Sequence, residues 1–287
     1  MGVQIARTDR RGQAPVGNSL SNLGRTVIIG GRFVRGGEIG SGGNGIVFNV
    51  TDRITGISLV AKQIKTNLEA LKAEAIANYQ LTYLGRMVNF ADTSFPLARS
   101  YGVKKGDDGN AYLIFEKVSG QTLFDILREK KRLPLAEALD IAVKICDALI
   151  MIKEEKMVHG DIKPENIFYD AKTGAIKIID FGQAVLSGEK GKKATLLFSS
   201  PEQTKQDKVD EKADVFSTCL TLVELLNGKN GFLRQRREQM INAEFTSPHI
   251  PRDLADCLYK AAHPAREQRS TLEQLRAGLI ELRKKYS

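Results

Sequence analysis

The chain of 287 residues lacks any long apolar run. No segment approaches the roughly 20 consecutive apolar residues that a membrane-spanning helix needs. The N-terminal segment is rich in Arg, Gly and Asn and lacks the apolar stretch of a secretory signal. The sequence therefore predicts a protein that is not inserted into a membrane and is not secreted through a signal peptide.

Cysteine is scarce, with three residues at positions 146, 219 and 257. Their number is odd, they are widely separated, and their spacing is not that of metal ligands. Such residues are typical of small buried side chains in a reducing compartment. We therefore expect a cytoplasmic protein in which these thiols carry no chemistry.

Aromatic residues are missing from the basic clusters. The net charge is +9, from 43 basic and 34 acidic residues. The clusters at 128–132 and 234–237 contain or adjoin glutamates and have no aromatic partners, unlike surfaces that bind nucleic acids. We expect solvated helix faces there and no nucleic-acid partner.

The composition changes twice along the chain. Residues 1–25 are polar and without periodicity, which predicts a flexible tail. The next segment is β-rich with one helical stretch, and the remainder is mainly helical. Strands are expected at 27–29, 33–34, 46–50, 58–64, 112–118, 167–169 and 175–179, and helices at 68–84, 123–129, 135–155, 214–227, 252–262 and 271–285.

Two motifs carry the chemistry. Residues 159–166 read H-G-D-I-K-P-E-N, and residues 178–182 read I-I-D-F-G. Two carboxylates and an amide in this order can hold the cations that neutralise a polyphosphate during in-line transfer. Asp161, Asn166 and Asp180 are the candidates, and the pattern predicts phosphoryl transfer from ATP.

A glycine-rich segment at 40–45 precedes these motifs. In a dinucleotide-binding fold a helix would follow such glycines, whereas residues 46–50 have strand composition. We therefore expect a turn between two antiparallel strands, folded over phosphates with its backbone amides. A plain glycine-rich hairpin is the alternative.

Lys62 lies in the strand expected to run beside the glycine-rich segment, where its ammonium could bind phosphate oxygens. A carboxylate should then hold the lysine. Glu74, in the helix that follows, is favoured over Glu69, because Glu69 falls near the helix start and would face solvent or the helix dipole.

With these motifs in this order, the chain resembles the eukaryotic-type protein kinases from about residue 33 to residue 269. The resemblance implies an α+β, two-lobed protein kinase-like fold. A small antiparallel β-sheet lobe with one main helix would span residues 26–118, and a larger, mainly helical lobe would span residues 119–287. It also implies ATP and Mg²⁺ or Mn²⁺ as cofactors and a protein as substrate.

The resemblance assigns roles to the catalytic residues. It makes Asp161 the carboxylate that accepts or orients the acceptor hydroxyl, and Lys163 a stabiliser of the moving phosphoryl group. Asn166 and Asp180 become metal ligands. Thr195 falls where Ser/Thr kinases place a threonine near this carboxylate. The implied catalytic set is Asp161, Lys163, Lys62, Glu74 and Thr195.

The nucleotide contacts implied by the resemblance lie on the glycine-rich segment and on the strands beside it. Phe115 would guard the rear of the adenine pocket, and Glu116 and Val118 would offer backbone hydrogen bonds to the base. The implied set is Ile39, Gly40, Ser41, Gly42, Gly43, Asn44, Gly45, Val47, Val60, Lys62, Phe115, Glu116 and Val118.

Supporting contacts are implied as well. His159 should pack behind the metal-binding loop, Asp214 should hold the catalytic-loop backbone, and Glu202 should form a buried ion pair with Arg269. One departure is informative: Gly160 replaces the arginine that reads a phosphorylated activation loop. We therefore expect activity without phosphorylation of that loop.

Three functions remain open: a Ser/Thr protein kinase, a small-molecule kinase and a nucleotide-binding pseudokinase. Aminoglycoside and choline kinases also begin their catalytic loop with H-G-D, but they usually lack a lysine two residues after the aspartate and a Pro-Glu-terminated activation segment. Lys163 and Pro201-Glu202 therefore favour a protein substrate. The expected charged residues are all present, which disfavours a pseudokinase.

The leader at 1–25 would suit a bacterial effector exported into the cytosol of a host cell, where a host protein would be the partner. An ordinary tail is the alternative. Deleting these residues should then abolish export and leave catalysis unchanged, and retained export would exclude the idea. The sequence leaves the natural substrate and the oligomeric state open.

Overall fold

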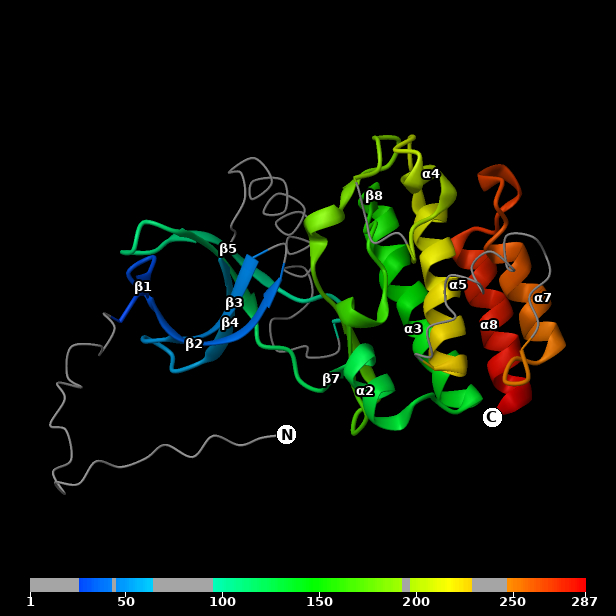
Figure 1. The fold of residues 1–287 in the computed structure, drawn as a ribbon, viewed down its shortest axis with the longest axis horizontal. Helices are drawn as coiled ribbons and strands as arrows, with labels where there is room; N and C mark the ends of the chain where they lie inside the picture. The colour runs from blue at the N-terminus through cyan, green and yellow to red at the C-terminus, as the bar shows by residue number, and fades with distance from the viewer. Residues whose placement is uncertain (1–25, 43–44, 64–94, 193–196, 229–246) are drawn as a thin grey trace, which may run out of the picture.

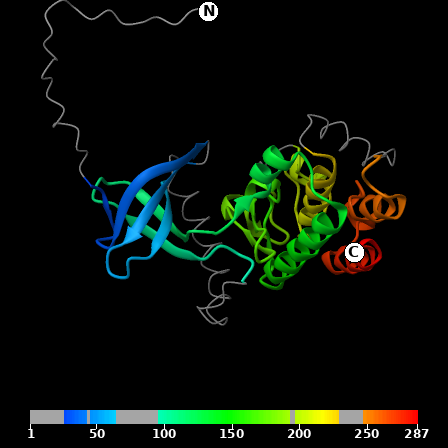
Figure 2. The same ribbon diagram turned by 90° about the horizontal axis from the view of Figure 1, so that it is seen from below.

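The computed structural model describes residues 26–42, 45–63, 95–192, 197–228 and 247–287. A β-sheet lobe lies at one end of the long axis of the molecule and a mainly helical lobe lies at the other (Figures 1 and 2). The expected two-lobed α+β architecture is confirmed. The expected tail at 1–25 and the helix at 68–84 lie outside the described residues.

The small lobe is a six-stranded antiparallel sheet with the strand order β1-β2-β3-β4-β6-β5. Alternate side chains, among them Phe48, Val50 and Leu59, turn inward and form a core of their own. The strands are β1 (Ile28–Ile29), β2 (Phe33–Gly42), β3 (Gly45–Asp52), β4 (Ser58–Gln63), β5 (Ser100–Lys105) and β6 (Ala111–Glu116).

Three strand predictions need correction. The glycine-rich turn was expected over 40–45, but β2 continues to Gly42 and β3 begins at Gly45, because the two strands pair as far as Gly42 with Gly45. The last sheet strand ends at Glu116 and not at Val118. The edge strand β5 was not predicted, since Ser100 is its only buried residue and its sequence has no apolar alternation.

The connection between the lobes leaves β6 and enters β7 (Gln121–Thr122) and α2 (Leu123–Lys130). Gly120 has a φ of +89°, and a Cβ there would lie 2.4 Å from the Tyr169 carbonyl oxygen. Only glycine therefore allows this close approach. The Thr122 hydroxyl accepts a hydrogen bond from the Asp125 N–H and begins the helix.

A second link joins the lobes beside the first. The Ala98 N–H donates to the Ile178 carbonyl, and the Ile178 N–H donates to the Pro96 carbonyl. In addition, the Glu116 carboxylate accepts a hydrogen bond from Lys177 Nζ at 2.7 Å. The segment leading into β5 is thereby bonded to the strand that ends at the metal-binding motif.

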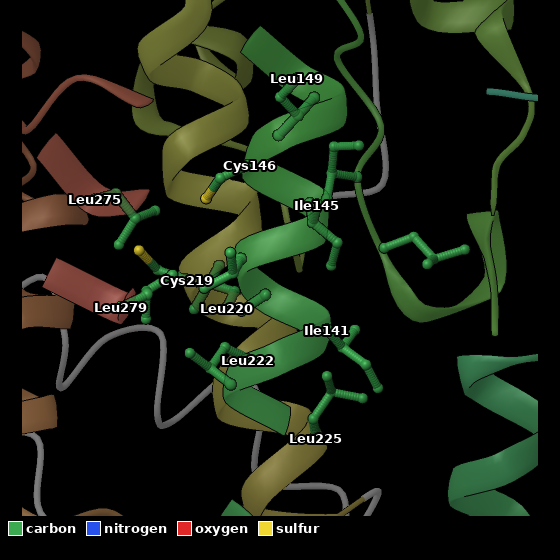
Figure 3. Packing of buried hydrophobic residues seen from close by; sticks show 14 of the residues in the cluster. Ile141, Ile145, Cys146, Leu149, Cys219, Leu220, Leu222, Leu225, Leu275 and Leu279 are labelled. Carbon is green, nitrogen blue, oxygen red and sulfur yellow. The ribbon is translucent and has the colours of Figure 1, made fainter. Parts of the chain in front are cut away.

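The helical lobe is built around α5 (Glu211–Asn227), which packs with α3 (Leu135–Glu154). Every residue of α5 from Ala213 to Asn227 is buried, because α3, α7 (Arg252–Ala261) and α8 (Leu272–Tyr286) contact it. Figure 3 shows the apolar side chains that fill the interior of this lobe. Cys146 and Cys219 are buried in this core, as their sequence pattern predicted, whereas Cys257 is only half-buried against it. Burial raises the pKa of all three thiols.

The expected helices of this lobe are present with small shifts. Helix α5 begins three residues earlier than expected, because the Asp210 carboxylate accepts a hydrogen bond from the Lys212 N–H and caps it. Short elements complete the lobe: β8 (Met157–Val158), η1 (Pro164–Asn166), β9 (Ile167–Asp170), β10 (Ala175–Ile178), η2 (Phe181–Gln183), β11 (Val185–Leu186), α4 (Pro201–Thr204) and η3 (Arg266–Gln268). Among the described residues, no helix has the length and apolar character needed to cross a membrane.

Candidate active site

A cavity of about 330 Å³ lies between the two lobes. Its walls are apolar, with Val47 and Val60 from the sheet and Phe168 from the helical lobe, and Lys62 and Asp180 add charges to its lining. Such a cavity can take a flat apolar ring and an anionic group together. Its lining residues are Ile39, Val47, Val60, Lys62, Ala98, Phe115, Glu116, Lys117, Val118, Phe168, Ile179 and Asp180.

Most of the predicted nucleotide contacts with side chains line this cavity. Sequence reasoning missed Ala98, Lys117, Phe168 and Ile179 as lining residues. Ala98 precedes an edge strand without a motif, and Phe168 becomes part of the lining only through the pairing of β9 with β7 and β10. No local sequence signal would have identified these two positions.

Lys62 is placed by the sheet. It lies on β4, opposite Val47 of β3 and Leu113 of β6. Its Nζ donates to Asp180 Oδ1 at 2.9 Å. Burial alone would raise the pKa of Asp180, but the Lys62 ammonium outweighs this and holds the pKa below its ordinary value. The lysine expected to bind phosphate and the aspartate of the I-I-D-F-G motif therefore form an ion pair between the two lobes.

The catalytic loop is organised around Asp161. Its Oδ2 accepts hydrogen bonds from Lys163 Nζ at 2.6 Å and from Asn166 Nδ2 at 3.0 Å. Asn166 Nδ2 also donates to the Asp161 carbonyl at 2.8 Å. Asp161 Oδ1 is buried and has no hydrogen-bond partner within the described part of the chain. One carboxylate oxygen is thus fixed, and the other is left to receive a further donor.

Buried side chains of Asp214, His159 and Phe181 hold the catalytic loop in place. Asp214 accepts hydrogen bonds from the His159 and Gly160 N–H groups, each at 2.8 Å. Burial raises the pKa of Asp214, although these hydrogen bonds and His159 oppose the shift. The His159 ring packs edge-on against Phe181, with centroids 4.9 Å apart, and its Nε2 lies 3.2 Å from the Ile179 carbonyl oxygen. The packing expected for His159 and Asp214 is confirmed.

The expected ion pair of Glu202 is also present. Arg269 Nη1 lies 2.6 Å from Glu202 Oε1, and Nη2 lies 3.1 Å from Oε2, in a bidentate arrangement. The Arg269 side chain is fully buried. This pair joins the end of the activation segment, at Glu202, to the loop before α8.

Several predicted site residues cannot be placed. Gly43, Asn44, Glu74 and Thr195 lie outside the described residues. Gly40, Ser41, Gly42 and Gly45 lie on the β2–β3 hairpin. The chain continues from these glycines as the strand β3, as expected, and not as the helix that a dinucleotide-binding motif requires.

Comparison with known families decides the identity of this fold. The protein kinase domain matches residues 33–285. The chain belongs to the protein kinase domain family. This kinase domain is 30% identical over 219 residues to a probable serine/threonine-protein kinase of Corynebacterium efficiens, a match that covers 72% of the chain and 32% of the relative.

Two further relatives are similar in the same way. The kinase domain is 28% identical over 258 residues to a probable serine/threonine-protein kinase of Clostridium perfringens, covering 82% of the chain and 36% of the relative. It is 32% identical over 186 residues to the serine/threonine-protein kinase PknB of Mycobacterium leprae, covering 59% of the chain and 30% of the relative. The kinase domain spans about a third of the length of these relatives.

The donor set of the kinase domain fits a nucleotide with a divalent cation. Asn166 uses its Nδ2 on Asp161, which leaves its amide oxygen for another contact. That oxygen and the Asp180 carboxylate are hard oxygen donors, the type of ligand that Mg²⁺ prefers. Across the described ranges, no group of three or more His, Cys, Asp and Glu side chains could hold a metal by itself.

Proposed function

We propose that this chain transfers the γ-phosphoryl group of ATP to serine or threonine hydroxyls of a protein substrate. The observation that supports this most directly is the Asp161 carboxylate, with Oδ2 held by Lys163 and Asn166 and Oδ1 buried without a partner among the described residues. The relatives from Corynebacterium, Clostridium and Mycobacterium carry the same activity in their names.

In the mechanism that we propose, each side chain has one task. Asp161 Oδ1 accepts or orients the proton of the acceptor hydroxyl, while Lys163 and Asn166 keep the carboxylate in place. Lys62 binds phosphate oxygens, and its ion pair with Asp180 keeps it at the end of the cavity. Bound ATP with Mg²⁺ or Mn²⁺ supplies the phosphoryl group that is transferred.

Glu74 as the further partner of Lys62, and Thr195 beside Asp161, remain predictions, because both lie outside the described residues. Phe115 as the rear of the adenine pocket and Glu116 and Val118 as its hydrogen-bonding edge are part of the same proposal. All three line the cavity. The boundary of the lobes at Val118 stays a prediction as well.

One assay separates this function from the alternatives. The purified chain is incubated with γ-labelled ATP and Mg²⁺, first with generic basic proteins and then with aminoglycosides and choline. We expect label on protein Ser or Thr that is lost in Asp161→Asn. Label on a small alcohol alone would indicate a small-molecule kinase, and nucleotide binding without transfer would indicate a pseudokinase.

We further propose that transfer needs no phosphorylation of the activation loop. Gly160 stands where an arginine would read the phosphate, and it cannot supply that cation. The described part of the activation segment has contacts of its own, including the hydrogen bond from Lys192 Nζ to the Gly182 carbonyl at 3.1 Å. These contacts need no added charge.

Phosphatase treatment of the purified chain tests this independence. We expect kcat to stay within about twofold after complete dephosphorylation, since Gly160 supplies no cation that would lose a phosphate partner. Mass spectrometry confirms that no phosphate remains. A loss of more than tenfold, recovered after incubation with ATP, would contradict the proposal.

Export into a host cell and a host protein as substrate depend on residues 1–25, which lie outside the described residues. Both remain predictions, to be tested by deleting these residues and measuring export. The cytoplasmic location expected for this protein also remains a prediction.

A further inference from the structure

Gln203 makes a long-range contact that neither the predicted site nor the mechanism uses. It follows Glu202 in α4 and is almost completely buried. Its Nε2 donates to the Gly160 carbonyl oxygen at 2.8 Å, across 43 residues of sequence. Its Oε1 accepts from the Ser200 N–H at 3.0 Å and from Ser200 Oγ at 3.2 Å. The whole amide is therefore engaged.

The orientation of this amide is fixed by its partners. The Gly160 carbonyl can only accept a hydrogen bond, and the Ser200 N–H can only donate one. Nε2 must therefore face the catalytic loop and Oε1 must face α4. The side chain joins the end of the activation segment to the residue before Asp161.

Both backbone polar groups of Gly160, its N–H and its carbonyl, form hydrogen bonds with side chains. Its N–H donates to Asp214 at 2.8 Å, and its carbonyl accepts from Gln203. This carbonyl belongs to the peptide bond that leads into Asp161. The Asp161 N–H of the same peptide donates to His159 Nδ1 at 3.2 Å. The contacts of Gln203 and His159 hold the two sides of this peptide and fix its plane, and so the direction in which the Asp161 side chain leaves the backbone.

Glycine at position 160 suits the backbone beside this contact. Gly160 has a φ of +78°, and a Cβ there would lie 2.9 Å from the Gln183 carbonyl oxygen, too close for any other residue without a shift of the backbone. The same Cβ would lie 3.5 Å from Gln203 Nε2, which is an ordinary packing distance. On the far side, Gly191 of the activation segment packs on the stem of Gln203, where a Cβ would lie 3.4 Å from Gln203 Cγ.

We propose that Gln203 is a positioning residue, which locks the activation segment onto the catalytic loop and takes the place of the arginine–phosphate contact that this chain lacks. The inference rests on the proposed kinase function. It adds a cause for the independence from phosphorylation: a neutral hydrogen bond, made during folding, orients the Asp161 peptide without a modification step.

The test uses two nearly isosteric replacements in the full chain. Gln203→Glu keeps an oxygen for the Ser200 N–H, so that the capping box of α4 survives, but at alkaline pH it places a second acceptor against the Gly160 carbonyl. Gln206→Glu makes the same chemical change on an exposed side chain three residues away and is the matched control.

We expect Gln203→Glu to lower kcat about tenfold at pH 9 with the KM for ATP within about twofold, because the orienting hydrogen bond is lost while the nucleotide cavity is untouched. As the pH is lowered, the introduced carboxyl gains a proton and can donate again, so the ratio of variant to wild-type kcat should rise. The ionisable groups nearby, Asp214, His159, Asp161 and Glu202, are the same in both proteins, so their own titration largely cancels in this ratio.

Amide hydrogen exchange gives a readout that does not depend on turnover. The N–H groups of His159 and Gly160 should exchange faster in Gln203→Glu than in Gln206→Glu. If Gln203→Glu keeps the wild-type kcat at pH 9 and its His159 and Gly160 N–H groups exchange no faster than in Gln206→Glu, the inference is wrong. A wild-type chain that transfers no phosphate would overturn the proposed function instead, and the exchange measurement would still decide the role of Gln203.

Discussion

Replacement of Asp161 by Asn will lower kcat for phosphoryl transfer by about a thousandfold, the middle of the range for loss of a positioned acid–base group. The substitution replaces a carboxylate oxygen with an amide nitrogen or leaves a weaker acceptor at the position of Oδ1, which is buried and has no partner among the described residues. Either way, the proton of the acceptor hydroxyl loses its acceptor. Because Asp161 does not line the nucleotide cavity, the affinity for ATP should stay within about threefold.

The matched control is Glu165→Gln. Glu165 lies in the same loop, is exposed, and undergoes the same change of charge and shape. Radiolabel transfer measures kcat, titration with a fluorescent ATP analogue measures affinity, and thermal unfolding confirms that both variants are folded. If Asp161→Asn keeps more than about a tenth of the wild-type kcat, the role proposed for Asp161 is wrong.

The second large effect concerns stability. Replacement of Arg269 by Ala will lower the free energy of unfolding by about 3–5 kcal/mol, because it leaves the buried Glu202 carboxylate without its cation. The Arg269 side chain is fully buried and that of Glu202 is 10% exposed. Arg269 also donates to the His263 and Lys212 carbonyls and lies 5.2 Å from the centroid of the Phe216 ring. The variant therefore loses several contacts at once.

Urea denaturation of Arg269→Ala and of a surface control measures this cost. Lys284→Ala breaks an ion pair with Glu281 in which both side chains are more than half exposed. That loss should stay below about 1 kcal/mol. Equal losses in the two variants would contradict the importance of the buried pair.

Acid should reduce the difference between wild type and Arg269→Ala. Burial alone would raise the pKa of Glu202, but the hydrogen bond and the positive charge of Arg269, with further hydrogen bonds to the carboxylate, together outweigh burial and hold the pKa below its ordinary value. The unfolded state then binds the proton at a higher pH than the folded state does. The stabilisation from the Glu202–Arg269 ion pair is complete above the pKa of Glu202 in the unfolded chain, about 4.3. It is lost as the pH falls through the lower pKa of Glu202 in the folded protein.

The side-chain cluster around Asp161 could be predicted because its residues are close together in sequence. Asp161, Lys163 and Asn166 occupy six consecutive positions, so one 3-10 turn brings them together whatever the rest of the chain does. Lys62 and Asp180 are far apart in sequence, and their ion pair was not predicted, because the carboxylate expected for Lys62 was Glu74. Spacing alone could not have supplied it.

Other features could not be predicted because they depend on tertiary contacts. The edge strand β5 has no apolar alternation and is defined by its hydrogen bonds to β6. Gln203 resembles an ordinary helix-capping residue, and its bond to Gly160 depends on how the activation segment packs on the catalytic loop. Both cases need information from the partner element, which no local pattern contains.

The paired links between the lobes limit how the kinase domain can move. The described residues join the lobes through 117–120 and through the hydrogen bonds of Pro96 and Ala98 with Ile178. Two attachments define an axis of rotation, and this axis runs along the side of the cleft where Glu116 meets Lys177. If the cavity binds ATP as proposed, a rotation of the sheet about this axis would open the cavity and leave both attachments intact.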